Sequence, residues 1–307
     1  MKPTITVLTT CYNHEDFIGQ AIEGVIAQTY PHWKMIILDD RSTDGSRAII
    51  QSFAEKDDRI SYYFDDKNVK KSARLNTYLD KVDTEYVAFL DSDDFWREDR
   101  LEKQMEVFQS HPEIDVCYSD GLVVDSRPAP KEGELWETLS SNQLFSEIHR
   151  IPEKRSGNLY TELLKGNFIF FSSPLVRHNI MKGISFIVVD KLGEDWYFWL
   201  DVAQRGANFK YLETPLSYYR IHGSGMMQSS WKQKGFFESR EVVYLERGQD
   251  MAPKDRAVAA YVLSRKYYRL GDLKKAKTYA SLSLKDHFWS PKALVNFLQM
   301  QLKSIVS

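Results

Sequence analysis

Three carboxylates stand within four consecutive positions at the end of an apolar stretch, YVAFLDSDDFW. They belong to Asp91, Asp93 and Asp94. Carboxylates this close repel one another and raise one another's pKa unless a cation or hydrogen-bond donors offset the charge. An Asp-x-Asp pair offers hard oxygen ligands of the kind that hold Mg²⁺ or Mn²⁺ together with substrate phosphates. An acidic turn that caps the next helix is the alternative, and it needs no metal.

Two more acidic pairs stand where they could face a ligand. Asp39 and Asp40 end a second apolar run, KMIILDD, and Glu194 and Asp195 open an amphipathic segment, GEDWYFWL. The first pair could instead be turn residues that cap the next helix. A helix N-terminus lowers the pKa of a carboxyl group, so Asp195 would be ionised. The alternative for the second pair is only to complement the helix dipole.

The elements that must position these carboxylates alternate over the first 120 residues. β-branched and apolar runs predict strands, and segments with one apolar face predict helices between them. In the first helix, residues 16–28, such a face is clear, and Asn13 with Asp16 resembles a helix cap. The expected strands are residues 4–10, 34–40, 59–66, 86–94 and 114–120.

This alternation predicts an α/β fold with a mostly parallel sheet, right-handed crossovers and helices on both faces. Ligands in such sheets bind outside the carboxyl ends of the strands. The polar residues that end the first, second and fourth strands should therefore converge on one edge, which predicts a site there. They are Thr10, Tyr12, Asn13, Asp39, Asp40, Asp91, Ser92, Asp93 and Asp94.

The chain beyond residue 120 is less regular. Residues 121–158 are rich in Pro, Glu, Ser and Lys, and we expect a long excursion with a short helix near residues 142–148. Residues 193–206 predict an amphipathic helix. Residues 209–227 predict a strand, a turn at Pro215 and a second strand.

The C-terminal segment has helical periodicity with breaks at Gly271 and Ser290, similar to one tetratricopeptide-like unit. One such unit cannot bury its own apolar face, so we expect it to pack on the main domain, a second subunit or a membrane surface. This divides the chain into a domain over residues 1–235, with halves 1–120 and 121–235, and a helical region over residues 236–307.

The composition is ordinary for a soluble globular protein, with 43% hydrophobic and 27% charged residues among 307. A formal net charge of −2 gives no indication of a polyanionic partner, so nucleic acid is not expected as a substrate. No apolar run approaches the roughly 18 residues that span a bilayer, and the N-terminus turns polar too early for a secretory signal. Cys11 and Cys117 show no disulfide or metal spacing, so we expect both buried and reduced. These features predict a cytosolic enzyme or binding protein.

Several motifs, taken in order, resemble those of the family-2 glycosyltransferases, which have the nucleotide-sugar-binding GT-A fold. They are a strand with TCYN, an amphipathic helix, QTYP, a strand with DDRSTDG and the strand end LDSDD. Each motif is common, but their combination in this order and spacing is specific. The resemblance covers about residues 3–225 and includes GEDWYFWL and YYRIHGSG.

The resemblance implies a nucleotide pocket. Thr10 and Tyr12 would border the base. Asp40, together with Asp39, would accept hydrogen bonds from a base N–H, which selects uracil or thymine. Arg74 in KKSARLN matches an arginine that reaches the nucleotide or diphosphate, for which its forked guanidinium is suited. The surrounding residues depart from the glycine-rich family pattern, and a plain surface helix position is the alternative.

The resemblance to the family-2 glycosyltransferases also implies a metal centre. Asp93 would be the direct ligand of Mn²⁺ or Mg²⁺. Asp91 would contact the ribose or the metal shell, Ser92 the nucleotide sugar, and Asp94 would cap the following helix. His222, in YYRIHGSG, would complete the metal shell or touch the diphosphate, and Arg220 would offset phosphate charge. No role is assigned to the other histidines.

The catalytic pair implied by the resemblance is Asp195 as general base and Glu194 as its support or as an acceptor-binding residue. Further candidates on the acceptor side are Asn167, Ser172 and, for stacking on a sugar, Trp196.

The implied function is inverting, metal-dependent transfer of a sugar from a nucleotide-diphosphate sugar, a UDP-sugar first of all, to a hydroxyl of a glycan or lipid-linked acceptor. Cell-surface polysaccharide biosynthesis at the inner face of the membrane is the expected setting, with peripheral membrane contact or a homodimer through the C-terminal helices. One alternative is a sugar-nucleotide nucleotidyltransferase, which would carry a Gly-rich basic loop after the first strand. The other is a non-catalytic binding protein that retains the fold. A haloacid-type phosphatase would need its Asp-x-Asp after the first strand.

Overall fold

The structure, a computed structural model, describes residues 5–125, 143–149, 152–188, 193–222, 241–245, 247–286, 295 and 297. These belong to two compact units, described separately below. The sheet unit comprises Met1–Leu159, Phe168–Val188 and Asp201–Gly225. The helical unit comprises Tyr160–Asn167, Val189–Leu200 and Met226–Ser307. The domain division at residue 235 stays a prediction.

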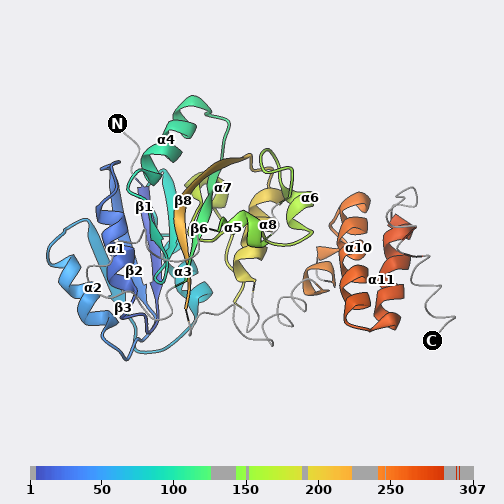
Figure 1. Ribbon diagram of the computed structural model, residues 1–307, viewed down its shortest axis with the longest axis horizontal. Coiled ribbons are helices and arrows are strands. Elements are labelled where there is room, and N and C mark those ends of the chain that lie inside the picture. The colour runs from blue at the N-terminus through green and yellow to red at the C-terminus, as the bar shows by residue number, and fades with distance from the viewer. Residues whose placement is uncertain are drawn as a thin grey trace. The chain divides into compact units, whose positions relative to one another are not determined.

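The sheet unit is built on one sheet with strand order β3-β2-β1-β4-β7-β6-β8-β5 (Figure 1). Its strands are β1 (Ile5–Cys11), β2 (Trp33–Asp39), β3 (Ile60–Phe64), β4 (Tyr86–Asp91), β5 (Phe95–Trp96), β6 (Val116–Asp125), β7 (Leu175–Arg177) and β8 (Phe209–Ile221). The described helices of the chain are α1 (Ile18–Ile26), α2 (Ser46–Ala54), α3 (Lys71–Leu79), α4 (Arg100–Ser110), α5 (Phe145–His149), α6 (Tyr160–Leu163), α7 (His178–Met181), α8 (Glu194–Gln204), α10 (Pro253–Arg269) and α11 (Leu273–Asp286).

The first four strands confirm the predicted α/β fold. β1 pairs in parallel with β2 and β4, and β2 pairs in parallel with β3. Every residue of β1 is buried, as is typical of a parallel strand covered on both faces. The register places Cys11 opposite Asp39 and Thr10 opposite Asp91, so the ends of β1, β2 and β4 meet at one edge.

The second half of the sheet differs from the prediction. β7 is antiparallel to β4 and β6, and β8 runs as one strand without the expected turn at Pro215. The pairing of β8 with β6 shifts register, and Pro215 lies in the interval between Leu212 and Ser217 that has no partner in β6. A proline is tolerated at such an irregularity because its missing N–H is not needed for the ladder. The predicted turn is therefore wrong.

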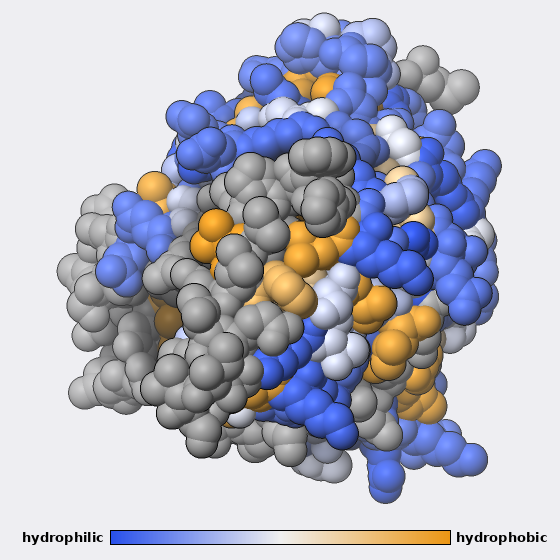
Figure 2. All heavy atoms as spheres, turned by 90° about the vertical axis from the view of Figure 1, so that its right-hand side faces the viewer, coloured by the Kyte–Doolittle hydropathy of each residue, from blue (hydrophilic) through white to orange (hydrophobic). Residues whose placement is uncertain are grey.

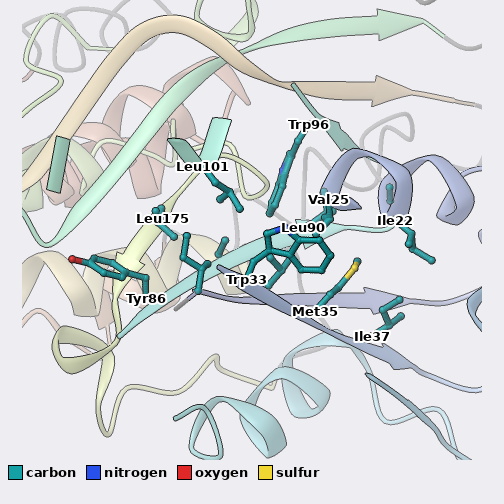
Figure 3. Packing of buried hydrophobic residues seen from close by; sticks show 14 of the residues in the cluster. Ile22, Val25, Trp33, Met35, Ile37, Tyr86, Leu90, Trp96, Leu101 and Leu175 are labelled. Carbon is teal, nitrogen blue, oxygen red and sulfur yellow. The ribbon is translucent and has the colours of Figure 1, made fainter. Parts of the chain in front are cut away.

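One core cluster of the described residues packs α1 and α4 against strands of the sheet (Figure 3). Ile22 and Val25 of α1 pack with Met35 of β2 and Leu90 of β4, and all four side chains are fully buried. They belong to the periodic pattern that predicted α1 and its neighbouring strands. Burying each such side chain stabilises the fold by about 1.5–3 kcal/mol relative to leaving it exposed.

Both cysteines are buried in this unit, as predicted. Burial raises the pKa of the Cys11 thiol to about 11 and that of the Cys117 thiol to about 12. Both thiols are therefore protonated at neutral pH and serve as small core residues.

Two glycines in α1 allow a matched test of its packing. A Cβ at Gly24 would meet the backbone of Trp96 at 3.1 Å from N and 3.4 Å from O, whereas at Gly19 the nearest atom is a flexible Ile49 methyl at 3.8 Å. Both substitutions gain the same helix propensity, so the steric clash decides the difference between them. We expect Gly24→Ala to be less stable than Gly19→Ala by about 1–3 kcal/mol in urea unfolding, and equal stabilities would contradict this account.

The helical unit contains the helical hairpin α10–α11 (Figure 1). Its turn has Gly271 at φ 80°, which confirms the predicted break. Ser264 Oγ donates to Ala276 O at 2.8 Å, and Arg256 forms an ion pair with Asp286 at 2.7 Å. The predicted break at Ser290 lies outside the described residues. The likeness to a tetratricopeptide unit stays a prediction.

No helix of the described residues is long and apolar enough to cross a membrane. On the face shown in Figure 2, hydrophobic residues form several small areas between hydrophilic ones. The exposed large hydrophobic residues of the helical unit include Leu245, Leu270 and Val295. Contact of the C-terminal helices with a membrane or with a second subunit stays a prediction.

Candidate active site

The loop after β1 is bonded to the loop after β2. Asn13, with φ 52°, accepts a hydrogen bond from Thr43 N at 2.8 Å, and its own N donates to Ser42 Oγ at 2.8 Å. The prediction that Asn13 caps the first helix is wrong, because α1 begins at Ile18 without a side-chain cap. The Asn13 amide is used instead to join the two loops at the edge of the sheet.

The nucleotide residues predicted after β1 lie at this edge. Thr10 is 8% exposed at the last position of the pairing with β4, and Tyr12 is 49% exposed just beyond the strand. An exposed aromatic ring at the carboxyl end of a parallel strand is available for a flat ligand such as a base. Thr10 is nearly buried, so it can contact a ligand only with a small part of its side chain.

Asp39 and Asp40 have different partners. Asp39 is fully buried, and its Oδ1 accepts from Ser42 N at 3.0 Å and Arg47 Nε at 2.7 Å. Its Oδ2 is buried with no hydrogen-bond partner in the described part of the chain. A buried carboxylate oxygen without a donor is costly, so a ligand N–H that reached it would be stabilising.

Asp40 organises the entry to α3. Its Oδ1 accepts from Val69 N and its Oδ2 from Lys70 N, each at 2.8 Å, and Lys70 has φ 74°. Arg74 is 6% exposed, forms an ion pair with Asp65 and has Nη2 at 3.8 Å from Asp40 Oδ1. Arg74 is thus a buried residue at this edge and not a plain surface position.

Asp91 forms an ion pair with Lys71, the first residue of α3. The Lys71 ammonium group also lies 3.7 Å from the centroid of the Phe171 ring. No role was predicted for Lys71. A basic pair, Lys70 and Lys71, next to the arginine motif was the only signal for it. The fold brings its positive charge to the acidic turn.

Asp93 is the acidic residue that faces a histidine. His222 Nε2 lies 3.0 Å from Asp93 Oδ2, and the Asp93 side chain is 24% exposed. Burial raises the pKa of Asp93, but the His222 hydrogen bond and the charges of His14 and His222 outweigh it, so the pKa lies below its usual value. Asp93 is therefore ionised at neutral pH.

Arg220 supports the same turn from β8. Its Nε donates to Asp93 O at 2.7 Å, and its Nη2 bonds to Gln20. Burial lowers the pKa of the guanidinium to about 10, so it stays protonated at neutral pH. It offsets part of the negative charge of the acidic turn.

Asp94 is not a helix cap, and that prediction is wrong. Its Oδ2 accepts from Ser172 Oγ at 2.6 Å and its Oδ1 from Arg220 N at 3.0 Å, whereas α4 begins after Asp99. Burial and the charges of Asp93 and Asp91 raise the pKa of Asp94 well above its usual value. Ser172 also accepts from Asp91 N at 3.0 Å, so it shapes the acidic turn.

Two overlapping sets of side chains could hold a metal ion, and Asp93 belongs to both. They are Asp91, Asp93 and Asp94, and His14, Asp93 and His222. Asp94 already has a donor on each oxygen, and one oxygen of Asp91 faces Lys71. Carboxylate oxygens suit Mn²⁺ or Mg²⁺ and imidazole nitrogens suit transition-metal ions, so these residues fit a divalent metal ion.

The predicted catalytic pair lies in the helical unit at the start of α8. Asp195 Oδ2 accepts from Asn167 Nδ2 at 2.8 Å and its Oδ1 from Trp196 N at 2.8 Å. Glu194 Oε2 accepts from Gly193 N at 3.2 Å. Hydrogen bonds to the charged form of a carboxylate favour its ionised state. The hydrogen bond from Asn167 also fixes the orientation of the Asp195 side chain.

Trp196 does not present its ring to a sugar. It is 2% exposed, and its Nε1 donates to Leu163 O at 2.6 Å. The indole is therefore a packed residue of the helical unit. Its helical spacing with apolar neighbours indicated this core alternative.

Comparisons with known proteins agree with one another. A family model described as Glycosyl transferase family 2 matches residues 6–163. The chain is 29% identical over 250 residues to the putative teichuronic acid biosynthesis glycosyltransferase TuaG of Bacillus subtilis, which covers 78% of this chain and 89% of the relative. It is 27% identical over 229 residues to the UDP-Glc:alpha-D-GlcNAc-diphosphoundecaprenol beta-1,3-glucosyltransferase WfaP of Escherichia coli, covering 75% and 82%.

Solved structures show the same fold. Residues 1–349 of S. aureus TarS in complex with UDP-GlcNAc match with a TM-score of 0.67 at 16% identity, covering 98% of this chain and 91% of that chain. The mannosyltransferase PcManGT from Pyrobaculum calidifontis, in complex with GDP-Man and Mn²⁺, matches with a TM-score of 0.56 at 16% identity, covering 99% and 88%.

Proposed function

The chain belongs to glycosyl transferase family 2 and is a glycosyltransferase with the GT-A fold, and from this we propose that it transfers a sugar from a UDP-sugar to a hydroxyl of a lipid-linked glycan, with inversion and with a divalent metal. The observation that carries the proposal is that Asp39 ends β2 at the edge where β1 and β4 also end, and that Asp93, just after β4, lies 3.0 Å from His222 after β8. The alternatives of a nucleotidyltransferase or a binding protein do not fit this family.

The base of the donor would bind beside β1 and β2. The unpartnered Oδ2 of Asp39 is a ready acceptor for the imide N–H of uracil. Tyr12 offers an exposed ring for stacking. WfaP is named as a transferase that uses UDP-Glc, and the matched TarS structure is a complex with UDP-GlcNAc.

The diphosphate would lie against the acidic turn. Asp93 and His222 would hold a divalent ion. The positive charge of this ion would offset the negative charge that develops on the leaving diphosphate. Arg220 remains positively charged beside them. Lys71, paired with Asp91, is a second positive group that could turn to a phosphate oxygen.

Asp195 would act as the general base. Asn167 and the N–H of Trp196 hold the carboxylate in one orientation, so it is ready to accept the proton of an acceptor hydroxyl. The freed oxygen then attacks the anomeric carbon from the side opposite the diphosphate, and a single displacement inverts that centre. Glu194 would bind the acceptor.

The acceptor class follows from the relatives and not from a pocket in the described residues. WfaP is named for a diphosphoundecaprenol-linked GlcNAc acceptor, and TuaG is named as a putative glycosyltransferase of teichuronic acid biosynthesis. We therefore propose a lipid-diphosphate-linked glycan in surface polysaccharide biosynthesis.

A donor and acceptor panel tests the function. The full chain is incubated with UDP-, GDP- and dTDP-sugars, Mn²⁺ and a synthetic lipid-diphosphate GlcNAc, and the products are followed by mass spectrometry and NMR. We expect one UDP-sugar to give a glycosylated lipid with inverted anomeric configuration. Products only from GDP-sugars, or a retained configuration, would overturn the proposal, as would silence across the panel.

A further inference from the structure

Two histidines and one aspartate from separate parts of the sheet unit meet beside the acidic turn. His14 follows β1, Asp93 follows β4 and His222 follows β8, and each offers one possible ligand atom within 4.8 Å of the other two. Ligand atoms about 2.0–2.3 Å from a shared ion lie about 3–4.5 Å apart, so the spacing is right. We propose that His14 is a third protein ligand of the divalent ion, which rests on the metal-dependent function proposed above.

His14 is held in place by three contacts. Its backbone N donates to Ser46 Oγ at 3.0 Å, its Nδ1 lies 2.7 Å from Ser92 Oγ, and its ring packs on the edge of Phe17 at 5.8 Å between centroids. When Nδ1 donates to Ser92, Nε2 keeps its lone pair. A hydrogen bond on the second ring nitrogen is the arrangement that orients metal-binding imidazoles.

The same ring system positions His222. Phe17 lies 4.4 Å from the His222 ring, and the two imidazoles lie 5.7 Å apart at 87°. Phe17 is 8% exposed and so forms a fixed wall for both histidines. Neither ring needs a large movement to share an ion with Asp93.

The competing all-carboxylate set is less suited. Asp94 accepts a hydrogen bond on each oxygen, and Asp91 is paired with Lys71. A set of two imidazoles and one carboxylate also differs from an all-carboxylate set in the metal ions that it prefers. Imidazole nitrogen suits iron, nickel, copper and zinc ions, whereas Mg²⁺ and Mn²⁺ are bound mainly by oxygen ligands. We therefore expect this set to bind an ion such as Zn²⁺ more tightly than Mn²⁺ or Mg²⁺, and Mn²⁺ serves below as the paramagnetic probe.

The first readout needs no variant. Mn²⁺ alone, added as the chloride to the full wild-type chain, is studied by pulsed EPR for nitrogen couplings. We expect couplings from two imidazole nitrogens on the bound ion. One coupling, or none, would overturn the role of His14.

The second readout compares His14→Gln with His111→Gln, a control whose side chain is 50% exposed at the end of α4. Titration of free Mn²⁺ by continuous-wave EPR gives the Kd of each variant. We expect His14→Gln to weaken Mn²⁺ binding by at least about tenfold, since loss of even an outer-shell partner costs 10–100-fold, and to lose one nitrogen coupling. The control should match wild type.

The outcomes separate this inference from the proposed function. One possible outcome is that wild type shows only one nitrogen coupling, which is lost in His222→Gln and kept in His14→Gln. In that case the His14 inference fails and the metal centre at Asp93 stands. If wild type binds no Mn²⁺ either alone or in the presence of UDP, the metal dependence in the proposed function fails as well. Equal Kd values for His14→Gln and wild type would also overturn the inference.

Discussion

Asp195→Asn is expected to lower the kcat of sugar transfer by about 10²–10⁴-fold while the Kd of the donor stays near that of wild type. Asparagine has the same size and keeps an oxygen that can accept from Asn167 or Trp196 N, so the start of α8 should retain its structure. Its amide cannot take a proton from the acceptor hydroxyl. Transfer is measured by product formation on a lipid-linked acceptor, and donor binding by calorimetry with Mn²⁺.

The matched control is Asp201→Asn, an acidic residue further along α8. We expect its transfer rate to match that of wild type. If Asp195→Asn transfers the sugar at the wild-type rate, Asp195 is not the general base. Loss of donor binding in Asp195→Asn would instead assign the residue to the donor pocket.

The second large effect is expected for Asp93→Asn. This change removes the carboxylate common to both possible metal-ligand sets and leaves His222 without its charged partner. A metal ion supplies several kcal/mol of charge stabilisation to the transition state, so kcat/KM with Mn²⁺ should fall by about 10³-fold or more. The Kd for Mn²⁺ should rise in parallel, which separates this effect from a loss of the base.

Asp99→Asn is a suitable control because the Asp99 side chain is 24% exposed, as is that of Asp93, and pairs with Arg97 and Lys103 at the start of α4. We expect it to leave kcat/KM unchanged. Asp91→Asn answers a second question, since a loss of Mn²⁺ affinity as large as that of Asp93→Asn would make Asp91 a direct ligand. Wild-type Mn²⁺ binding by Asp93→Asn would contradict the proposed centre.

Local patterns were sufficient for the framework of the site. The fully buried run of β1 and the apolar face of α1 follow from residue type and spacing, and the motifs after β1, β2 and β4 lie where such strands end. Parallel pairing of these strands then brings their carboxyl ends to one edge of the sheet, independently of how the helices pack. The fold class was predictable for this reason, and the family was predictable from the resemblance of the ordered motifs.

Side-chain partners were not predictable in the same way. Asp94 was expected at a helix cap, yet it is buried between Ser172, which is 78 positions away, and Arg220, which is 126 away. Nothing in the residues next to Asp94 indicates these donors. The expected cap at Asn13 failed similarly, because a loop 30 positions away offers Thr43 N to its amide.

The sequence by itself determined an α/β chain with acidic residues at three element ends, because strand and helix periods act over a few neighbouring residues, and its ordered motifs carried the resemblance to the family-2 glycosyltransferases. The tertiary structure alone decided which acids are free to bind. It pairs Asp91 with Lys71, buries Asp94, leaves one oxygen of Asp39 without a partner in the described residues, and places His222 against Asp93 across 129 positions. Such pairings depend on the crossing of distant strands and on burial, which no local period encodes.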